Sequence, residues 1–137
     1  AVHIWRLWSG DDMQMSGYPA KIEHVAWHPT SRYLAIGSIG EITIWDFAGR
    51  GPQGTRPTTL DAHTRHVTAL AYRPDGNRLA SGDANGDLYL WAPPKRTSPN
   101  AHANLGSAIS TLAWHPDGSR LYAGTAEGTI TAITTTS

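Results

Sequence analysis

Short apolar segments alternate with turns rich in glycine and proline along most of the chain. Residues 67–72, VTALAY, form one such segment, and the turn RPDGN follows at 73–77. In this turn proline presets φ, and glycine supplies a positive φ that other residues rarely adopt. Residues 78–82, RLASG, then begin a second apolar segment. The pattern indicates two short strands joined by a tight turn.

The dipeptide Asn85-Gly86 follows, and it is preferred in two-residue hairpins. It leads into DLYLW at 87–91, which we predict to be a third strand. We expect a fourth strand in the looser stretch from Arg96 to Ala101, before the pattern begins again. Helical periodicity is nowhere sustained, so the sequence predicts an all-β protein.

The pattern occurs three times, in segments that start near residues 21, 66 and 108. Matching prolines and matching glycines are each spaced by 45 and then 42 residues. They are Pro29, Pro74 and Pro116, and Gly37, Gly82 and Gly124. A period of roughly 40–45 residues with four strands in each unit is typical of propeller blades.

The second repeat resembles a blade of the WD-repeat family, whose pattern has a Gly-His pair, a P-D-G turn, S-G, D-G and a closing W-D. The matching residues are His63, Val67, Pro74, Asp75, Gly76, Ser81, Gly82, Gly86 and Trp91. The sequence departs from the pattern at Ala62, Asn85 and Ala92. The resemblance implies an all-β fold of β-propeller blades, each a four-stranded antiparallel sheet, with about three blades and an incomplete ring.

We expect residues 1–16 to be the last strands of an upstream blade, and 17–61 and 62–104 to be complete blades. Residues 105–137 would form a C-terminal blade without its outer strand. The chain looks like the C-terminal part of a bacterial WD-repeat protein, because the turn GRGPQGTRP resembles one seen in such proteins. The missing blades would come from the parent chain, giving roughly seven in all, or from a second copy, giving a ring of six.

Ser81, His63 and Asp83 suggest a hydrolytic triad by residue type alone. In the WD-repeat family the matching serine and histidine instead belong to a structural network with a strand tryptophan and a turn aspartate. The resemblance therefore implies a network of His63, Ser81, Asn85 and Trp91, with Trp45 as the corresponding tryptophan of the first blade. Such a network satisfies buried polar groups that would otherwise destabilise the fold.

Composition narrows the possible partners. Eleven basic residues offset eleven acidic ones, so we expect no nucleic-acid partner. No apolar run is long enough to cross a membrane, and we expect no membrane partner. The chain has seven histidines but no cysteine, and the histidine spacings fit no metal site. We therefore predict no metal and no cofactor, and the absence of cysteine favours a cytoplasmic location.

The resemblance implies a non-catalytic scaffold that binds protein partners, whose identity the sequence does not give. The loops expected to contact them hold Tyr18, Arg65, His66, Asp83, Asn104 and Glu127. Two alternatives stay open. One is a propeller enzyme or metal-binding propeller with its site at the central channel. The other is a structural fragment or engineered module that assembles into a full propeller.

Overall fold

The computed structural model describes residues 2–5, 12–15, 24–30, 32–37, 39–47, 57–93 and 96–134. These residues form strands and turns and contain no helix, so none of them belongs to a helix able to span a membrane. The described residues form twelve strands: β1 (Val2–Trp5), β2 (Asp12–Met15), β3 (His24–Trp27), β4 (Tyr33–Gly37), β5 (Ile39–Asp46), β6 (Thr58–Tyr72), β7 (Leu79–Asp83), β8 (Asp87–Trp91), β9 (Ala101–Asn104), β10 (Ile109–Trp114), β11 (Arg120–Thr125) and β12 (Ile130–Thr134). The all-β prediction is confirmed.

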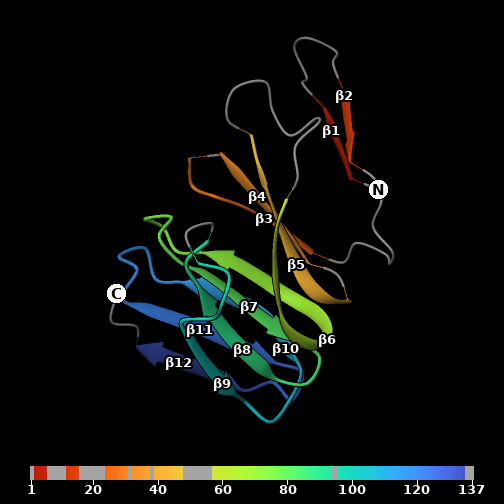
Figure 1. The fold of residues 1–137 in the computed structure, drawn as a ribbon. Coiled ribbons are helices and arrows are strands. Elements are labelled where there is room, and N and C mark those ends of the chain that lie inside the picture. The colour runs from red at the N-terminus through yellow and green to blue at the C-terminus, as the bar shows by residue number, and fades with distance from the viewer. Residues whose placement is uncertain are drawn as a thin grey trace.

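The long strand β6 belongs to two sheets. Its first part pairs antiparallel with β5, from Thr58↔Ile44 to Asp61↔Glu41, and its second part pairs with β7. We call β3, β4, β5 and the start of β6 blade 1, and the end of β6 with β7, β8 and β9 blade 2. Blade 3 consists of β10, β11 and β12. Figure 1 shows β6 passing from β5 to β7 without a break.

The sheets are antiparallel throughout, and the described strands form an open series of blades rather than a closed ring. The fourth strand of blade 2, β9, begins at Ala101, where the segment predicted for it ends. The prediction placed this strand too early. Strands β1 and β2 form a separate hairpin with Val2 opposite Met15.

The core consists of two apolar layers, one on each side of blade 2. The layer toward blade 1 contains the buried residues Ala35, Ile42, Ile44, Leu60, Val67, Leu79 and Trp91. The layer toward blade 3 contains Ala69, Ala80, Leu88, Ile109, Leu112, Leu121 and Ala123. Blade 2 is thus buried on both faces, and β7 has no exposed residue.

Two glycines set how closely the blades approach. A Cβ at Gly37 would lie 2.7 Å from Val67 of blade 2, and a Cβ at Gly82 would lie 2.6 Å from Ile109 of blade 3. Neither distance leaves room for a side chain. Gly37 and Gly82 therefore mark the places where a β-branched residue of the next blade packs onto the backbone of the previous one.

Candidate functional site

A chain of buried hydrogen bonds crosses blade 2 from β8 to the turn after β7. The Trp91 indole N–H donates to Ser81 Oγ at 2.8 Å, and Ser81 Oγ lies 2.6 Å from His63 Nε2. His63 Nδ1 lies 2.7 Å from Asp83 Oδ2. All four side chains are at most 4% exposed.

Strand alternation explains why these groups meet. Ser81 and Asp83 are two residues apart on β7, so both side chains point to the same face of the sheet. Trp91 lies at the end of β8, and His63 approaches from β6. The neighbouring strands β6, β7 and β8 thus bring polar groups into an otherwise apolar layer. Strands β6 and β8 contribute one each, and β7 contributes two.

The network prediction was correct for His63, Ser81 and Trp91 and wrong for Asn85. Asp83 takes the acidic place, whereas the Asn85 side chain is outside the buried chain and donates to Asp87 Oδ2 at 3.2 Å. Trp45 lies on β5 of blade 1, opposite Leu34 and half-buried. It corresponds to Trp91 by repeat but belongs to another sheet.

The hydrogen-bond directions follow from a neutral histidine. Burial lowers the pKa of the His63 imidazole, although its hydrogen bond to Asp83 opposes the shift. The Nδ1–H then donates to Asp83, and Nε2 accepts the Ser81 hydroxyl proton. Asp83 Oδ1 accepts from the backbone N–H groups of Asn85 and Asp87, at 2.9 and 3.0 Å. The network therefore fixes the backbone of the turn that follows β7.

Ser81, His63 and Asp83 have the order and contacts of a hydrolytic triad, but their surroundings are not those of an active site. Ser81 and Asp83 are 0% exposed, so a substrate has no path to the hydroxyl. The Trp91 indole N–H already occupies one side of Ser81 Oγ. A nucleophile needs an open approach and donors for the developing oxyanion. The geometry supports a structural role.

Blade 3 fills the same place with apolar side chains. Leu105, Ala123 and Ile133 correspond to His63, Ser81 and Trp91, and all three belong to the apolar layer between blades 2 and 3. In blade 1 the residue that corresponds to Ser81 is Ile36, which is 1% exposed. The polar network is a property of blade 2 within the described residues.

The turns at one end of the blades are joined into a continuous surface, which we call the ledge. It comprises residues 39–40, 63–66, 83–87, 104–108 and 126–128. Backbone hydrogen bonds link neighbouring members: Ala84 N donates to His66 O at 3.0 Å, Leu105 N to Gly86 O at 2.9 Å, and Ala126 N to Ala108 O at 2.9 Å. Gly40 extends it to blade 1, because a Cβ there would lie 3.2 Å from His63 O.

Four of the predicted partner-binding residues, Arg65, His66, Asn104 and Glu127, are exposed on this ledge. Asp83 was also predicted there, and that prediction is wrong, because its side chain is buried in the network. Tyr18 lies outside the described residues. The structure thus brings the predicted loops together, but Asp83 lies in the core and not on the surface.

Asp87, which the sequence pattern does not single out, organises the part of the ledge formed by blade 2. Its Oδ1 accepts from Asn104 Nδ2 and His102 Nε2, each at 2.9 Å. The hydrogen bonds from Asn104 and His102 lower the pKa of Asp87 to about 2. The His102 ring in turn stacks on Tyr89 with 4.5 Å between centroids. The sequence does contain a signal for this role of Asp87. It is an aspartate next to a turn, with several side chains that can donate hydrogen bonds on its own strand and the next one.

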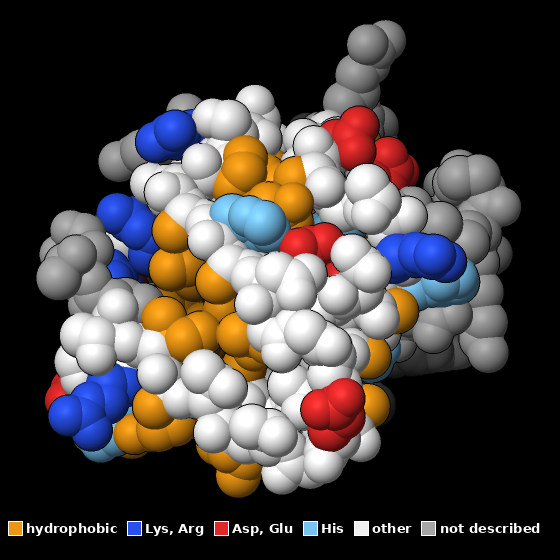
Figure 2. Space-filling model, turned by 90° about the horizontal axis from the view of Figure 1, so that it is seen from below, with side chains coloured by type: hydrophobic (Ala, Val, Ile, Leu, Met, Phe, Trp, Pro, Cys, Tyr) orange, Lys and Arg blue, Asp and Glu red, His pale blue; other side chains and the backbone are white. Residues whose placement is uncertain are grey.

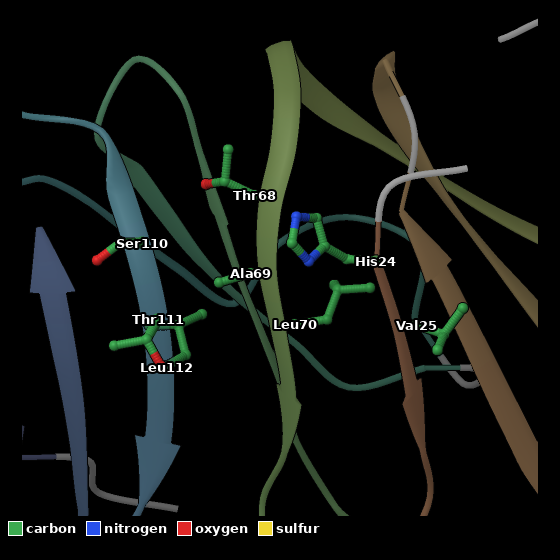
Figure 3. A pocket seen from close by; sticks show the side chains of 8 residues that line it. All are labelled: His24, Val25, Thr68, Ala69, Leu70, Ser110, Thr111 and Leu112. Carbon is green, nitrogen blue, oxygen red and sulfur yellow. The ribbon is translucent and has the colours of Figure 1, made fainter. Parts of the chain in front are cut away.

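The inner strands β3, β6 and β10 lie side by side and border an open groove of about 160 Å³ (Figure 3). It is lined by His24, Val25, Thr68, Ala69, Leu70, Ser110, Thr111 and Leu112, among which the only ionisable side chain is that of His24. Among the residues that the structure describes, no three histidine or acidic side chains gather to hold a metal. The groove offers no cluster of charged groups for chemistry at the channel.

Three features of the molecule point to one protein family: the sequence repeats, the glycine spacing and the buried tryptophan–serine–histidine–aspartate network. A family model described as "WD domain, G-beta repeat" matches residues 10–46, 54–92 and 94–131. The chain belongs to the WD-repeat family. The resemblance predicted from the second repeat is confirmed.

Known proteins are similar over part of their length. The anaphase-promoting complex subunit cdh1 of Dictyostelium discoideum is 28% identical over 93 residues, which cover 66% of this chain and 12% of that protein. The COMPASS component SWD1 of Saccharomyces cerevisiae is 29% identical over 92 residues, covering 66% of this chain and 22% of that protein. The chain thus matches less than a quarter of either relative.

Two solved structures superimpose on most of the chain. A chain in the crystal structure of a mitotic checkpoint complex matches with a TM-score of 0.78 and 26% identity, covering 90% of this chain and 37% of that one. The β-propeller domain of Myceliophteria thermophila Cps50 (Swd1) matches with a TM-score of 0.73 and 18% identity, covering 85% and 36%. The second likeness shows the propeller fold.

We predict that His63→Leu lowers the free energy of unfolding by about 3 kcal/mol, because Asp83 and Ser81 lose a partner while the packed volume changes little. The volume-conserving control is Leu105→Met at the corresponding place in blade 3, which should cost less than about 1.5 kcal/mol. Urea unfolding followed by tryptophan fluorescence measures both. Equal losses in the two variants would contradict the assignment of the network.

A second prediction concerns the loss of stability at acidic pH. An aspartate has an ordinary pKa of about 3.9, so the unfolded chain takes up the Asp87 proton before the folded chain does. The stability that Asp87 adds is therefore present above about pH 4 and is lost as the pH falls toward 2. Thermal midpoints at pH 6 and pH 2.5 should differ less in Asp87→Asn than in the unchanged chain. An identical pH dependence in both proteins would show that Asp87 contributes nothing.

Proposed function

We propose that this chain is a non-catalytic platform for protein–protein interaction, with the ledge as its binding surface. The observation that carries the proposal is the set of hydrogen bonds that connects the ledge to the core. Asp83 holds the Asn85 and Asp87 backbone from inside the protein, while Asn104 and His102 bond to Asp87 from outside. The exposed side chains of the ledge are thus presented on turns that the core fixes, which reduces the entropy lost on binding.

The named roles of the relatives support the same function. The cdh1 protein is called a subunit of the anaphase-promoting complex, and SWD1 a component of COMPASS. We extend participation in a protein assembly to this chain, without its specific partners. The ledge carries the basic Arg65 and the acidic Glu127 on different turns, among neutral polar groups, so a partner surface of mixed charge would fit it. The proposal includes a cytoplasmic location, favoured by the absence of cysteine, and a bacterial source, favoured by the turn GRGPQGTRP.

Charge reversal on the ledge tests the proposal. Affinity purification of the tagged protein should recover a partner. The Arg65→Glu variant should recover at least about tenfold less of it, as expected when charge reversal turns an attractive contact at an interface into a repulsive one. The matched control is Arg120→Glu, at the start of β11, whose other end leads into the ledge. Loss of the partner in both variants, or in neither, would remove the ledge from the binding surface.

The alternative hypothesis, that the protein is a serine hydrolase, can be tested separately. Because Ser81 is fully buried and hydrogen-bonded, a fluorophosphonate probe should leave it unlabelled after incubation with the folded protein. Intact-mass measurement and peptide mapping detect the adduct, and a known serine hydrolase in the same reaction serves as the control. Stoichiometric labelling of Ser81 would overturn the non-catalytic assignment.

A further inference from the structure

Asn85 and Gly86 form a pair with a chemistry of its own. An asparagine followed by glycine loses its side-chain amide more readily than other asparagines, because glycine has no side chain to shield its backbone nitrogen. The pair occurs once in the chain, since the other asparagines precede arginine, alanine and leucine. The Asn85 side chain is exposed on the ledge and lies outside the buried network. Residue 85 therefore combines a reactive sequence with access to water.

The fold requires the glycine of this pair. Gly86 has a φ of 87°, which side-chain-bearing residues rarely adopt. A Cβ there would also lie 2.8 Å from Ser107 O of the neighbouring turn. A larger residue, which would slow the reaction, is thus incompatible with the contact between these two turns of the ledge.

Hydrogen bonds of the folded turn oppose the reaction. Loss of the amide begins when the Gly86 backbone nitrogen attacks Asn85 Cγ, so this nitrogen must give up its proton. In the structure that N–H donates to Asp83 O at 3.1 Å. The Asn85 Nδ2 group donates to Asp87 Oδ2 at 3.2 Å, and Asn85 O accepts from Asn104 Nδ2 at 3.2 Å. The nucleophile, the amide and the peptide group between them are all held.

The buried network determines how often this turn can open. Asp83 Oδ1 accepts from the backbone N–H groups of Asn85 and Asp87, while Asp83 Oδ2 contacts His63. Opening the turn therefore breaks bonds to a carboxylate that is 0% exposed and has no water to replace them. Removing a partner of this carboxylate should raise the fraction of molecules in which the turn is open.

We propose that Asn85 is a site of spontaneous covalent modification, and that the His63–Asp83 pair controls its rate by keeping the turn closed. The Gly86 nitrogen forms a bond to Asn85 Cγ while the Cγ–Nδ2 bond breaks, and Nδ2 leaves as ammonia with the proton that Gly86 gave up. The product is a cyclic imide. Water then opens the imide at either carbonyl, which gives aspartate or, with the backbone routed through Cγ, isoaspartate. Water is the only other reactant.

Either product removes the tie between residue 85 and Asp87. A carboxylate replaces the amide that donated to Asp87 Oδ2, so two like charges meet in place of a hydrogen bond. The lost donor and the added negative charge raise the pKa of Asp87. Isoaspartate also lengthens the backbone between the two N–H groups that Asp83 Oδ1 holds. Modification thus opens the turn that had slowed it.

The added charge falls in a sparsely charged region. Figure 2, which views the molecule from the side where β9 lies in Figure 1, shows scattered charged side chains among hydrophobic and uncharged ones. Asn104, at the end of β9, bonds to both Asn85 and Asp87. A second carboxylate is therefore a large local change at the centre of the ledge. That it would weaken the binding of a partner rests on the proposed function, whereas the reaction itself needs no partner.

The rate of modification can be measured on the isolated protein. The chain is incubated in mildly alkaline buffer, either folded or in urea, and digested with trypsin, which places Asn85 in peptide 79–95 and Asn77 in peptide 66–78. Mass spectrometry quantifies the aspartate and isoaspartate forms, with Asn77 as the internal reference. Asn85 should react at least about tenfold more slowly in the folded protein than in urea, because the turn must open first. Equal rates, or no reaction in urea, would overturn the proposal.

His63→Leu tests the control by the network. This variant should accelerate the reaction of Asn85 in the folded protein by at least about tenfold. The matched control is Leu121→Ala, which leaves a cavity in the layer between blades 2 and 3 and destabilises the protein without touching Asp83. Tryptophan fluorescence confirms that both variants are folded during the incubation. Equal acceleration in the two, or none in His63→Leu, would show that the network does not control the rate.

Two milder variants keep the proposal testable if His63→Leu does not fold. Asp87→Ala releases the Asn85 side chain and should also accelerate the reaction, so an unchanged rate would contradict the protection described above. Asn85→Asp reproduces one product. Hydrogen exchange at the backbone N–H of residue 87 should be faster in this variant than in Asn85→Ala, which lacks the donor but adds no charge. Exchange that is no faster would overturn the opening of the turn by the new carboxylate.

Discussion

The whole architecture depends on the close approach of one blade to the next. A twisted sheet of three or four short strands has two faces, and in blade 2 both faces are packed in apolar layers. Gly37 and Gly82 let the following blade approach until Val67 and Ile109 touch the backbone. The apolar layers on both sides of blade 2 form only because these two positions have no side chain. A blade in this protein is therefore a unit of structure but not a unit of stability.

The buried network adds specificity to this apolar packing. A serine, a histidine and an aspartate in hydrogen-bond contact can attack a carbonyl or hold a turn in place, and burial decides between these roles. In blade 2 every polar atom of the chain from Trp91 to Asp83 has a protein partner, and the end of the chain is the backbone of the turn itself. Blade 3 shows that leucine, alanine and isoleucine can fill the same space. What the polar version adds is a fixed turn, since only a carboxylate can accept from two backbone N–H groups and a histidine together.

The strands of blade 2 could be predicted because each is bounded by a strong turn signal, P-D-G on one side and Asn-Gly on the other. The fourth strand could not be placed, since Ala-His-Ala-Asn is exposed throughout and has no apolar alternation. The acidic member of the network was misassigned by following the family spacing to Asn85. The period of two along β7 contained the correct answer, because it places residue 83 on the same face as Ser81. The ledge residues could be predicted as loops, but their connection into one surface depends on hydrogen bonds between turns far apart in sequence.

The same connection explains why a rigid interior matters for a surface that binds. The ledge turns carry few apolar residues and would lose considerable conformational entropy if they had to be ordered by a partner. In blade 2 that ordering is already complete, since Asp83 fixes the turn from within and Asp87 ties it to Asn104 and His102 of the neighbouring strand. In blade 3 the corresponding turn has Glu127 and Gly128 but no buried carboxylate beneath it, and its order rests on backbone bonds such as Gly128 N to Thr125 O at 3.0 Å. The ledge is thus most firmly held at its centre, where blade 2 is packed on both faces, and depends increasingly on neighbouring blades toward its ends.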